Sequence, residues 1–192
     1  MKFTTVIALF AGLVASAPID LEARQSRACF VIGTQTLPQE TATIAEQLRG
    51  RIRCDASRRT LSGVPDVSSG NVRFSAINFA TDPRRRTSLQ FALEEFRTAT
   101  PLRNTNLADF QRKLDVYLAT EAGIRSVGGN LAIKVPKFFL QFQVSRIQTA
   151  QGNPPTAPGL QVDHLLEKVL KNAPRESQAL RDEVVRLSKV LA

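Results

Sequence analysis

The sequence feature that most constrains the fold is an apolar stretch at residues 128–147. Apart from the N-terminal leader it is the most apolar part of the chain, and it holds no acidic residue. Its bulky members are Leu131, Ile133, Val135, Phe138, Phe139, Leu140, Phe142, Val144 and Ile147. Burial of one such side chain contributes roughly 1.5 to 3 kcal/mol. We therefore expect the rest of the chain to pack around this stretch.

The pattern within this stretch fits two kinds of element. The residues before Pro136 alternate as in a strand, and those after it fit either alternation or helical spacing. Proline suits the start of a helix far better than the middle of a strand. We therefore expect a strand before Pro136 and a helix after it.

Other helices are predicted by apolar residues that recur at three- and four-residue spacing. They are expected at 38–51, with a capping box from Thr36 to Gln39, from Thr87 to Pro101, and at 106–122 with Asn106 as the cap. Two short amphipathic helices follow residue 160, with Pro174 between them. Residues 28–32 fit a strand or a turn of helix, 55–70 read as a loop, and 72–79 as a bulged strand.

The first residues predict export from the cell. Met1 and Lys2 give a positive start, residues 3–14 are apolar, and small residues follow, so we expect a signal peptide at 1–16, cleaved between Ser16 and Ala17. A short pro-segment, 17–24, ends at Arg24 and precedes Gln25. This arrangement resembles the leader of many small secreted proteins of filamentous fungi. The resemblance implies cleavage by a kexin-type protease after Arg24 and cyclisation of Gln25.

The two cysteines of the chain, Cys29 and Cys54, are expected to form one disulfide in an oxidising secretory route. The resulting fold class is mainly α with a minor β component (α+β). We expect a single compact disulfide-tied domain at 25–148, a Pro/Gly linker at 149–159 and a C-terminal hairpin of amphipathic helices at 160–192. No second apolar run is long enough to span a bilayer, so we expect a protein that is released outside the cell or held at the cell wall.

Charge gives the strongest indication of a partner. The chain carries a net charge of +9, and its arginines form runs. Residues that could bind an anionic partner are Arg49, Arg51, Arg53, Arg58, Arg59, Arg84, Arg85 and Arg86; further cations on the last helix are Arg175, Arg181, Arg186 and Lys189. For a secreted protein such partners are an anionic polysaccharide, an acidic lipid surface or another protein. Specific nucleic-acid binding is not expected, because the phenylalanines occur at core spacing.

No catalytic motif is recognisable in the sequence. The only histidine, His164, would have to serve any catalytic triad, and a glycosidase would need two facing carboxylates from Glu94, Glu95, Asp109, Asp115 and Glu121. We therefore expect a small non-enzymatic basic protein, of an effector-like or wall-associated kind, without a cofactor or metal. The alternatives are a small secreted hydrolase that uses these carboxylates or His164, and a peptide precursor cut at Arg58-Arg59 and at 84–86.

Overall fold

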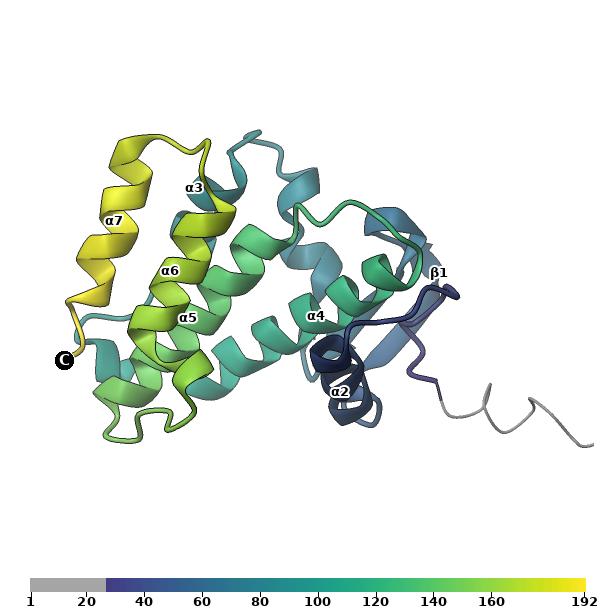
Figure 1. The fold of residues 1–192 in the computed structure, drawn as a ribbon, viewed down its shortest axis with the longest axis horizontal. Coiled ribbons are helices and arrows are strands. Elements are labelled where there is room, and N and C mark those ends of the chain that lie inside the picture. The colour runs from purple at the N-terminus through teal and green to yellow at the C-terminus, as the bar shows by residue number, and fades with distance from the viewer. Residues whose placement is uncertain (1–26) are drawn as a thin grey trace, which may run out of the picture.

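Two long helices, α4 (Leu107–Ser126) and α5 (Lys134–Ala150), lie at the centre of the fold in the computed structural model, which describes residues 27–192. Both carry fully buried side chains, among them Tyr117 and Ile124 on α4 and Phe139 and Phe142 on α5. The other elements pack around this pair (Figure 1). The predicted processing residues Ser16, Ala17, Arg24 and Gln25 fall outside the described residues.

Helix starts follow local capping chemistry in two of the predicted cases. The Asn106 side chain accepts a hydrogen bond from the Asp109 N–H and begins α4, and the Thr87 side chain accepts one from the Gln90 N–H and begins α3 (Ser88–Glu95). Both caps are confirmed, although α3 ends well before Pro101. The capping box predicted at Thr36 is wrong, because α2 (Gln39–Leu48) begins after Pro38 without a side-chain cap.

Helix α5 starts earlier than predicted. Its first residue is Lys134, so the strand expected before Pro136 is wrong and the helix expected after it is confirmed. Pro136 lies in the first turn of α5, where backbone N–H groups have no partner within the helix. The proline therefore removes no hydrogen bond from α5. Of the apolar residues before it, Ala132 and Ile133 form a turn that leads into the helix.

A small antiparallel sheet occupies the segment between α2 and α3. Its strands are β1 (Arg53–Arg59), β2 (Pro65–Ser69) and β3 (Val72–Arg73), in that order, with Cys54 opposite Val67 and Ser68 opposite Arg73. The loop predicted at 55–70 is therefore wrong. Strand β1 is polar and largely exposed, so it lacks the apolar alternation that marks a strand. Of the strand predicted at 72–79, only Val72 and Arg73 are in a strand. A 3-10 turn follows at Phe74–Ile77, and Phe74 and Ile77 are buried.

The predicted disulfide is confirmed. Cys29 and Cys54 are bonded, with their Cα atoms 6.1 Å apart. The bond joins the segment before α2 to strand β1, and residues 28–32 form a turn in which Phe30 is fully buried. The disulfide therefore fixes the N-terminal segment against the sheet.

The C-terminal helices are part of the same domain. Helix α6 (Val162–Asn172) packs on α5, and α7 (Gln178–Ser188) packs on α3 and α6. Leu165, Val169 and Val184 are buried in these contacts. The predicted fold class, mainly α with a minor β component, is confirmed. Within residues 27–192, every helix is too short or too polar to cross a membrane.

Candidate functional site

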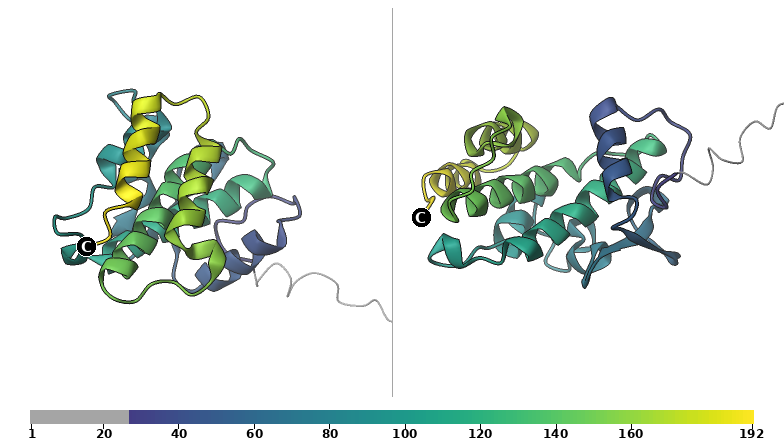
Figure 2. Two further views of the ribbon diagram at one scale, coloured as in Figure 1. Left: turned by 60° about the vertical axis from the view of Figure 1, so that its left-hand side comes forward. Right: turned by 90° about the horizontal axis from the view of Figure 1, so that it is seen from below.

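A cavity of about 590 Å³ opens between four helices, and we call it the cationic cavity. Helices α2 and α6 stand on the same side of the α4–α5 layer (Figure 2, right). Side chains from all four helices line the cavity. Its walls come from the four helices and from the connector between α5 and α6. They are Glu40, Thr41 and Ile44 from α2, Leu118, Glu121 and Arg125 from α4, Lys134, Lys137, Phe138 and Gln141 from α5, Gly159 and Leu160 from the connector, and His164, Leu165, Lys168, Lys171 and Asn172 from α6.

Helical periodicity places these side chains. Residues three, four and seven positions apart lie on one face of a helix. On α5 this face carries Lys134, Lys137, Phe138 and Gln141. On α6 the same spacing aligns His164, Lys168 and Lys171, and on α4 it aligns Glu121 with Arg125. Each helix therefore contributes a short polar stripe beside its apolar face.

An ion pair lies at the base of the cationic cavity. Lys137 Nζ is 2.8 Å from Glu121 Oε2, and Arg125 Nη2 is 2.8 Å from Glu121 Oε1. The side chains of Lys137 and Glu121 are both more than nine-tenths buried. Lys137 Nζ also lies 3.7 Å from the centre of the Phe138 ring. Both carboxylate oxygens of Glu121 are thus engaged by cations.

Burial lowers the pKa of the Lys137 ammonium, and the charge of Glu121 opposes this shift. A second negative charge near the ammonium group would act in the same sense as Glu121, because a nearby anion favours the charged form of lysine.

The cavity carries an excess of positive charge. Five of its wall residues are cationic and two are carboxylates. The cations are Arg125, Lys134, Lys137, Lys168 and Lys171, and the carboxylates are Glu40 and Glu121. A concave surface lined by one sign of charge focuses the field and concentrates ligands of the opposite sign. The geometry therefore suits an anion.

A second cavity of about 430 Å³ adjoins the first, and we call it the neutral cavity. The two share Gln141, Leu160 and Leu165. The other walls of the neutral cavity are Arg51, Gln111, Leu114, Asp115, Val144, Ser145 and Gln148. Its single cation and single carboxylate are paired, because Arg51 Nη2 lies 2.8 Å from Asp115 Oδ2. Its remaining polar groups are amides and one hydroxyl.

The arginines predicted from the first run lie on the connection from α2 to β1 and along β1. Arg53, Arg58 and Arg59 are exposed, Arg49 pairs with Glu46, and Arg51 pairs with Asp115 in the neutral cavity. Strand β1 is at one end of the molecule, whereas α3, which follows the second run, lies towards the other end (Figure 1). The two runs therefore do not form one continuous face.

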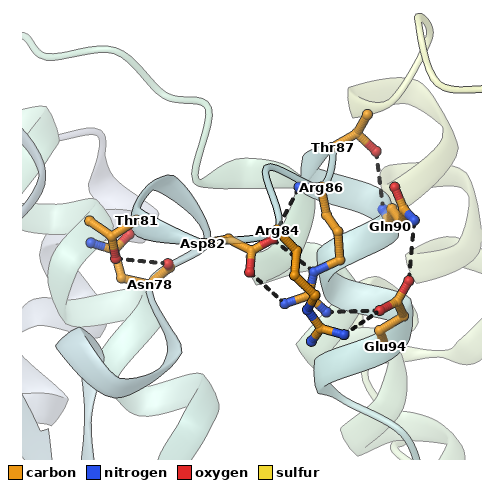
Figure 3. A network of polar contacts seen from close by, with 8 residues as sticks. All are labelled: Asn78, Thr81, Asp82, Arg84, Arg86, Thr87, Gln90 and Glu94. Atoms are coloured by element: carbon orange, nitrogen blue, oxygen red, sulfur yellow. Dashed lines mark hydrogen bonds and ion pairs between the residues drawn. The ribbon is translucent and has the colours of Figure 1, made fainter.

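The second run, Arg84 to Arg86, belongs to a polar network at the start of α3 (Figure 3). Arg86 donates from Nε and Nη2 to the two carboxylate oxygens of Asp82, each over 2.8 Å, and from Nη1 to Glu94. Its side chain is only 5% exposed. The prediction that Arg86 offers its charge to a partner is thus corrected, because the guanidinium is already used inside the fold. Arg84, which also pairs with Glu94, and Arg85 remain exposed.

The carboxylates considered for catalysis are dispersed. Glu94 belongs to the network at α3, Asp109 pairs with Lys113, and Asp115 lies in the neutral cavity. Burial raises the pKa of Asp115, although Arg51 and Ser69 oppose the shift. Of the predicted catalytic residues, the structure brings only Glu121 and His164 to one cavity. Within residues 27–192, no three His, Cys, Asp or Glu side chains are placed to hold a metal ion.

Most of the cationic cavity was not predicted as a site. The sequence does contain one signal for it, which is the polar stripe of Lys134, Lys137 and Gln141 within the most apolar part of the chain. A basic residue repeated at helical spacing inside a core helix indicates a face that is not packed against apolar neighbours. The walls from α2 and α6 could not be assigned to this stripe without the tertiary structure.

Comparison with known proteins assigns the chain to a family whose function is unknown. A family model described as "Domain of unknown function (DUF7143)" matches residues 31–192. This range includes every wall residue of both cavities. No curated protein and no solved structure matches the chain.

Proposed function

This chain belongs to the DUF7143 family, whose function is unknown, and we propose from its cavities that it is a secreted, non-enzymatic binding protein for an anionic ligand. The observation that carries the proposal is the cationic cavity, in which five cations face two carboxylates around the buried pair of Lys137 and Glu121. A preformed concave site with converging polar groups is the usual form of a small-ligand site.

Two features support a site outside the cell. The leader has the charge and apolar pattern of a signal peptide, and the chain carries the Cys29–Cys54 disulfide, which is typical of oxidising compartments. Mass spectrometry of the protein from culture medium tests this part. The proposal expects a single species that begins near Gln25; an intact leader on protein inside the cell, or fragments ending at Arg59 or Arg86, would contradict it.

Removal of two cavity charges tests the binding function. Lys168 and Lys171 line the cavity from α6, and neither is buried, so Lys168→Gln with Lys171→Gln preserves the fold. Titration calorimetry with citrate and inorganic phosphate is expected to show saturable binding that this variant weakens by about tenfold or more. Raised salt is expected to weaken binding as well.

The matched control removes the same charge elsewhere. Arg175→Gln with Lys189→Gln changes two exposed cations that do not line the cavity. We expect this control to bind like the unmodified protein. If both variants lose affinity equally, binding follows net charge alone, and the proposed cavity site is wrong.

A second candidate function is hydrolysis, because His164 and the carboxylates Glu40 and Glu121 share the cavity. Glu121 is poorly suited to proton transfer, since cations engage both of its oxygens. Glu40→Gln and His164→Ala separate the two functions. The binding proposal expects the unmodified protein to leave its ligand intact; cleavage that stops in either variant would establish the enzyme.

A further inference from the structure

The cationic and neutral cavities adjoin, and Gln141, Leu160 and Leu165 line both of them. We propose that the two cavities act as one cleft that binds an acidic oligosaccharide, with a sugar carboxylate in the cationic cavity and neutral hydroxyls in the neutral cavity. This inference rests on the proposed anion-binding function and names its ligand class.

The neutral cavity offers the groups that recognise sugar hydroxyls. A hydroxyl both donates and accepts hydrogen bonds, and so does the primary amide of glutamine. Three glutamines, Gln111, Gln141 and Gln148, line the cavity, together with the paired Arg51 and Asp115. Because this lining has no excess charge, it suits a neutral polar part of a ligand better than a second anion.

Asp115 is held in place before any ligand arrives. Its Oδ2 accepts hydrogen bonds from Arg51 Nη2 over 2.8 Å and from Ser69 Oγ over 3.0 Å, while the residue is only 6% exposed. Both contacts use the same oxygen. The other oxygen has acceptor capacity for a ligand hydroxyl, in an orientation that the two contacts fix.

Two polar atoms in the wall of the neutral cavity have no hydrogen-bond partner in the described part of the chain. They are the hydroxyl oxygen of Ser145, a residue that is 2% exposed, and the side-chain oxygen of Gln141. Both residues line the neutral cavity. Buried polar groups are nearly always satisfied by protein, water or ligand. Both atoms are buried, so the two side chains would have to turn towards the neutral cavity to meet a bound hydroxyl.

The apolar walls complete the match to a sugar. Leu114, Val144, Leu160 and Leu165 line the neutral cavity between its polar groups, and Phe138 lines the cationic one. A sugar ring presents C–H groups on its faces and hydroxyls around its edge. A cleft that alternates apolar side chains with fixed polar groups is complementary to both.

The test compares ligands that differ in charge and length. The probes are aldotriouronic acid, in which one glucuronic acid is linked to the neutral disaccharide xylobiose, monomeric glucuronic acid, the neutral trisaccharide xylotriose, and inorganic phosphate, each titrated calorimetrically into the full secreted chain. The inference expects aldotriouronic acid to bind at least about tenfold more tightly than the monomer, which carries the same single carboxylate, and xylotriose to bind far more weakly than either. Equal affinity for the acidic trimer and monomer would overturn it.

Variants of the neutral cavity test whether the preference for the acidic trimer arises there. Gln111 and Gln148 are not buried, so Gln111→Ala with Gln148→Ala preserves the fold. This variant is expected to lose about tenfold in affinity for aldotriouronic acid and to keep its affinity for phosphate. The matched control is Gln47→Ala with Gln178→Ala, two exposed glutamines that line neither cavity.

The outcomes separate this inference from the proposed function. Two results would overturn the oligosaccharide inference and leave the anion site standing. One is that the protein binds phosphate but does not prefer the acidic trimer; the other is that the glutamine variant keeps its affinity for the trimer. Loss of all binding in the unmodified protein, phosphate included, overturns both. Trimer binding that both the glutamine variant and the Lys168→Gln, Lys171→Gln variant weaken supports both.

Discussion

Lys137 is a charged side chain on a core helix, and its charge is paired inside the protein. It lies in the most apolar part of the chain and is 7% exposed, yet its ammonium group reaches Glu121 and the Phe138 ring. A buried charge is tolerated only when it is paired. Glu121 supplies this pair, and Arg125 draws on the same carboxylate, so the cavity keeps a positive excess that a ligand can use.

At the same scale, Asp82 predicts a pH dependence of stability. The hydrogen bonds from Arg86 hold the pKa of Asp82 well below its usual value of 3.8, despite the opposing effect of burial. A carboxyl whose pKa is lowered by folding stabilises the protein above its unfolded pKa, and the stabilisation is lost as the pH falls towards the folded pKa. Asp82→Asn is therefore expected to lower the thermal midpoint at neutral pH.

The difference between Asp82→Asn and the unmodified protein should shrink as the pH falls from about 5 to about 2, because the unmodified protein then loses the same ion pair. Thermal unfolding followed by circular dichroism across this range measures it. Asp163→Asn, at an exposed position on α6, is the control and should show little difference at any pH. A gap for Asp82→Asn that stays constant would show that Asp82 contributes by packing rather than by charge.

Among the elements, α4 depends on a close approach at Gly123. A Cβ atom at this position would lie 2.6 Å from the carbonyl oxygen of Phe30 and 2.7 Å from the methyl groups of Val64. In an unhindered helix, alanine is more favourable than glycine by about 1 kcal/mol. The contact reverses that preference, because the N-terminal segment and the turn before β2 would have to move.

Gly123→Ala is therefore expected to lower the free energy of unfolding by about 1 to 3 kcal/mol. Urea denaturation measures the change. Gly50→Ala is the matched control, since a Cβ atom at Gly50 meets nothing within 4 Å, and it should leave stability nearly unchanged. A stabilised Gly123→Ala protein would mean that α4 is not packed against Phe30 and Val64.

The elements that could be predicted from the sequence are those fixed by local chemistry. Asn106 and Thr87 cap the helices that follow them, and Pro174 separates the last two helices, each through groups a few residues away. Strands β1 and β2 could not be predicted, because polar residues such as Arg53 and Ser68 pair across the sheet without an apolar pattern. Their pairing follows from the packing of β2 and β3 on α4 and from the disulfide.

The candidate site was predictable only in part for a related reason. The spacing of Lys134, Lys137 and Gln141 is visible within one helix, but Glu40 and Lys171 reach the same cavity from positions far apart in the chain. Long-range packing decides that convergence, and a single sequence carries no record of it. The arginine runs are visible in the sequence because their residues are close together in the chain. The structure nevertheless places Arg86 in an internal ion-pair network.

For the whole molecule, the disulfide is the principal covalent constraint in the described chain. It closes a loop over a sequence separation of 25 residues, for which chain entropy gives a stabilisation of about 3 kcal/mol. Cys29→Ser with Cys54→Ser should lower the free energy of unfolding by about this amount and make the remaining stability insensitive to reducing agent. Unfolding in urea with and without dithiothreitol measures both; an unmodified protein indifferent to the reductant would argue against a stabilising bond.

The arrangement of the whole molecule also explains why the cavity exists. Helix α6 reaches α5 after the connector and stands opposite α2, while Arg146 holds the chain end by donating to the carbonyl oxygen of Val190 over 2.8 Å. Burial lowers the pKa of Arg146 to about 10. Helix α6 therefore supplies one wall of the proposed binding site, and α6 and α7 together cover the core.

The most direct test of the anion site is a nuclear magnetic resonance titration of the lysine and arginine side chains with aldotriouronic acid and phosphate. We predict saturable shifts at Lys137, Lys168 and Lys171, with exposed Arg53, Arg58 and Arg59 little affected. Shifts confined to those arginines, or no saturable shift in the cavity, would contradict the account.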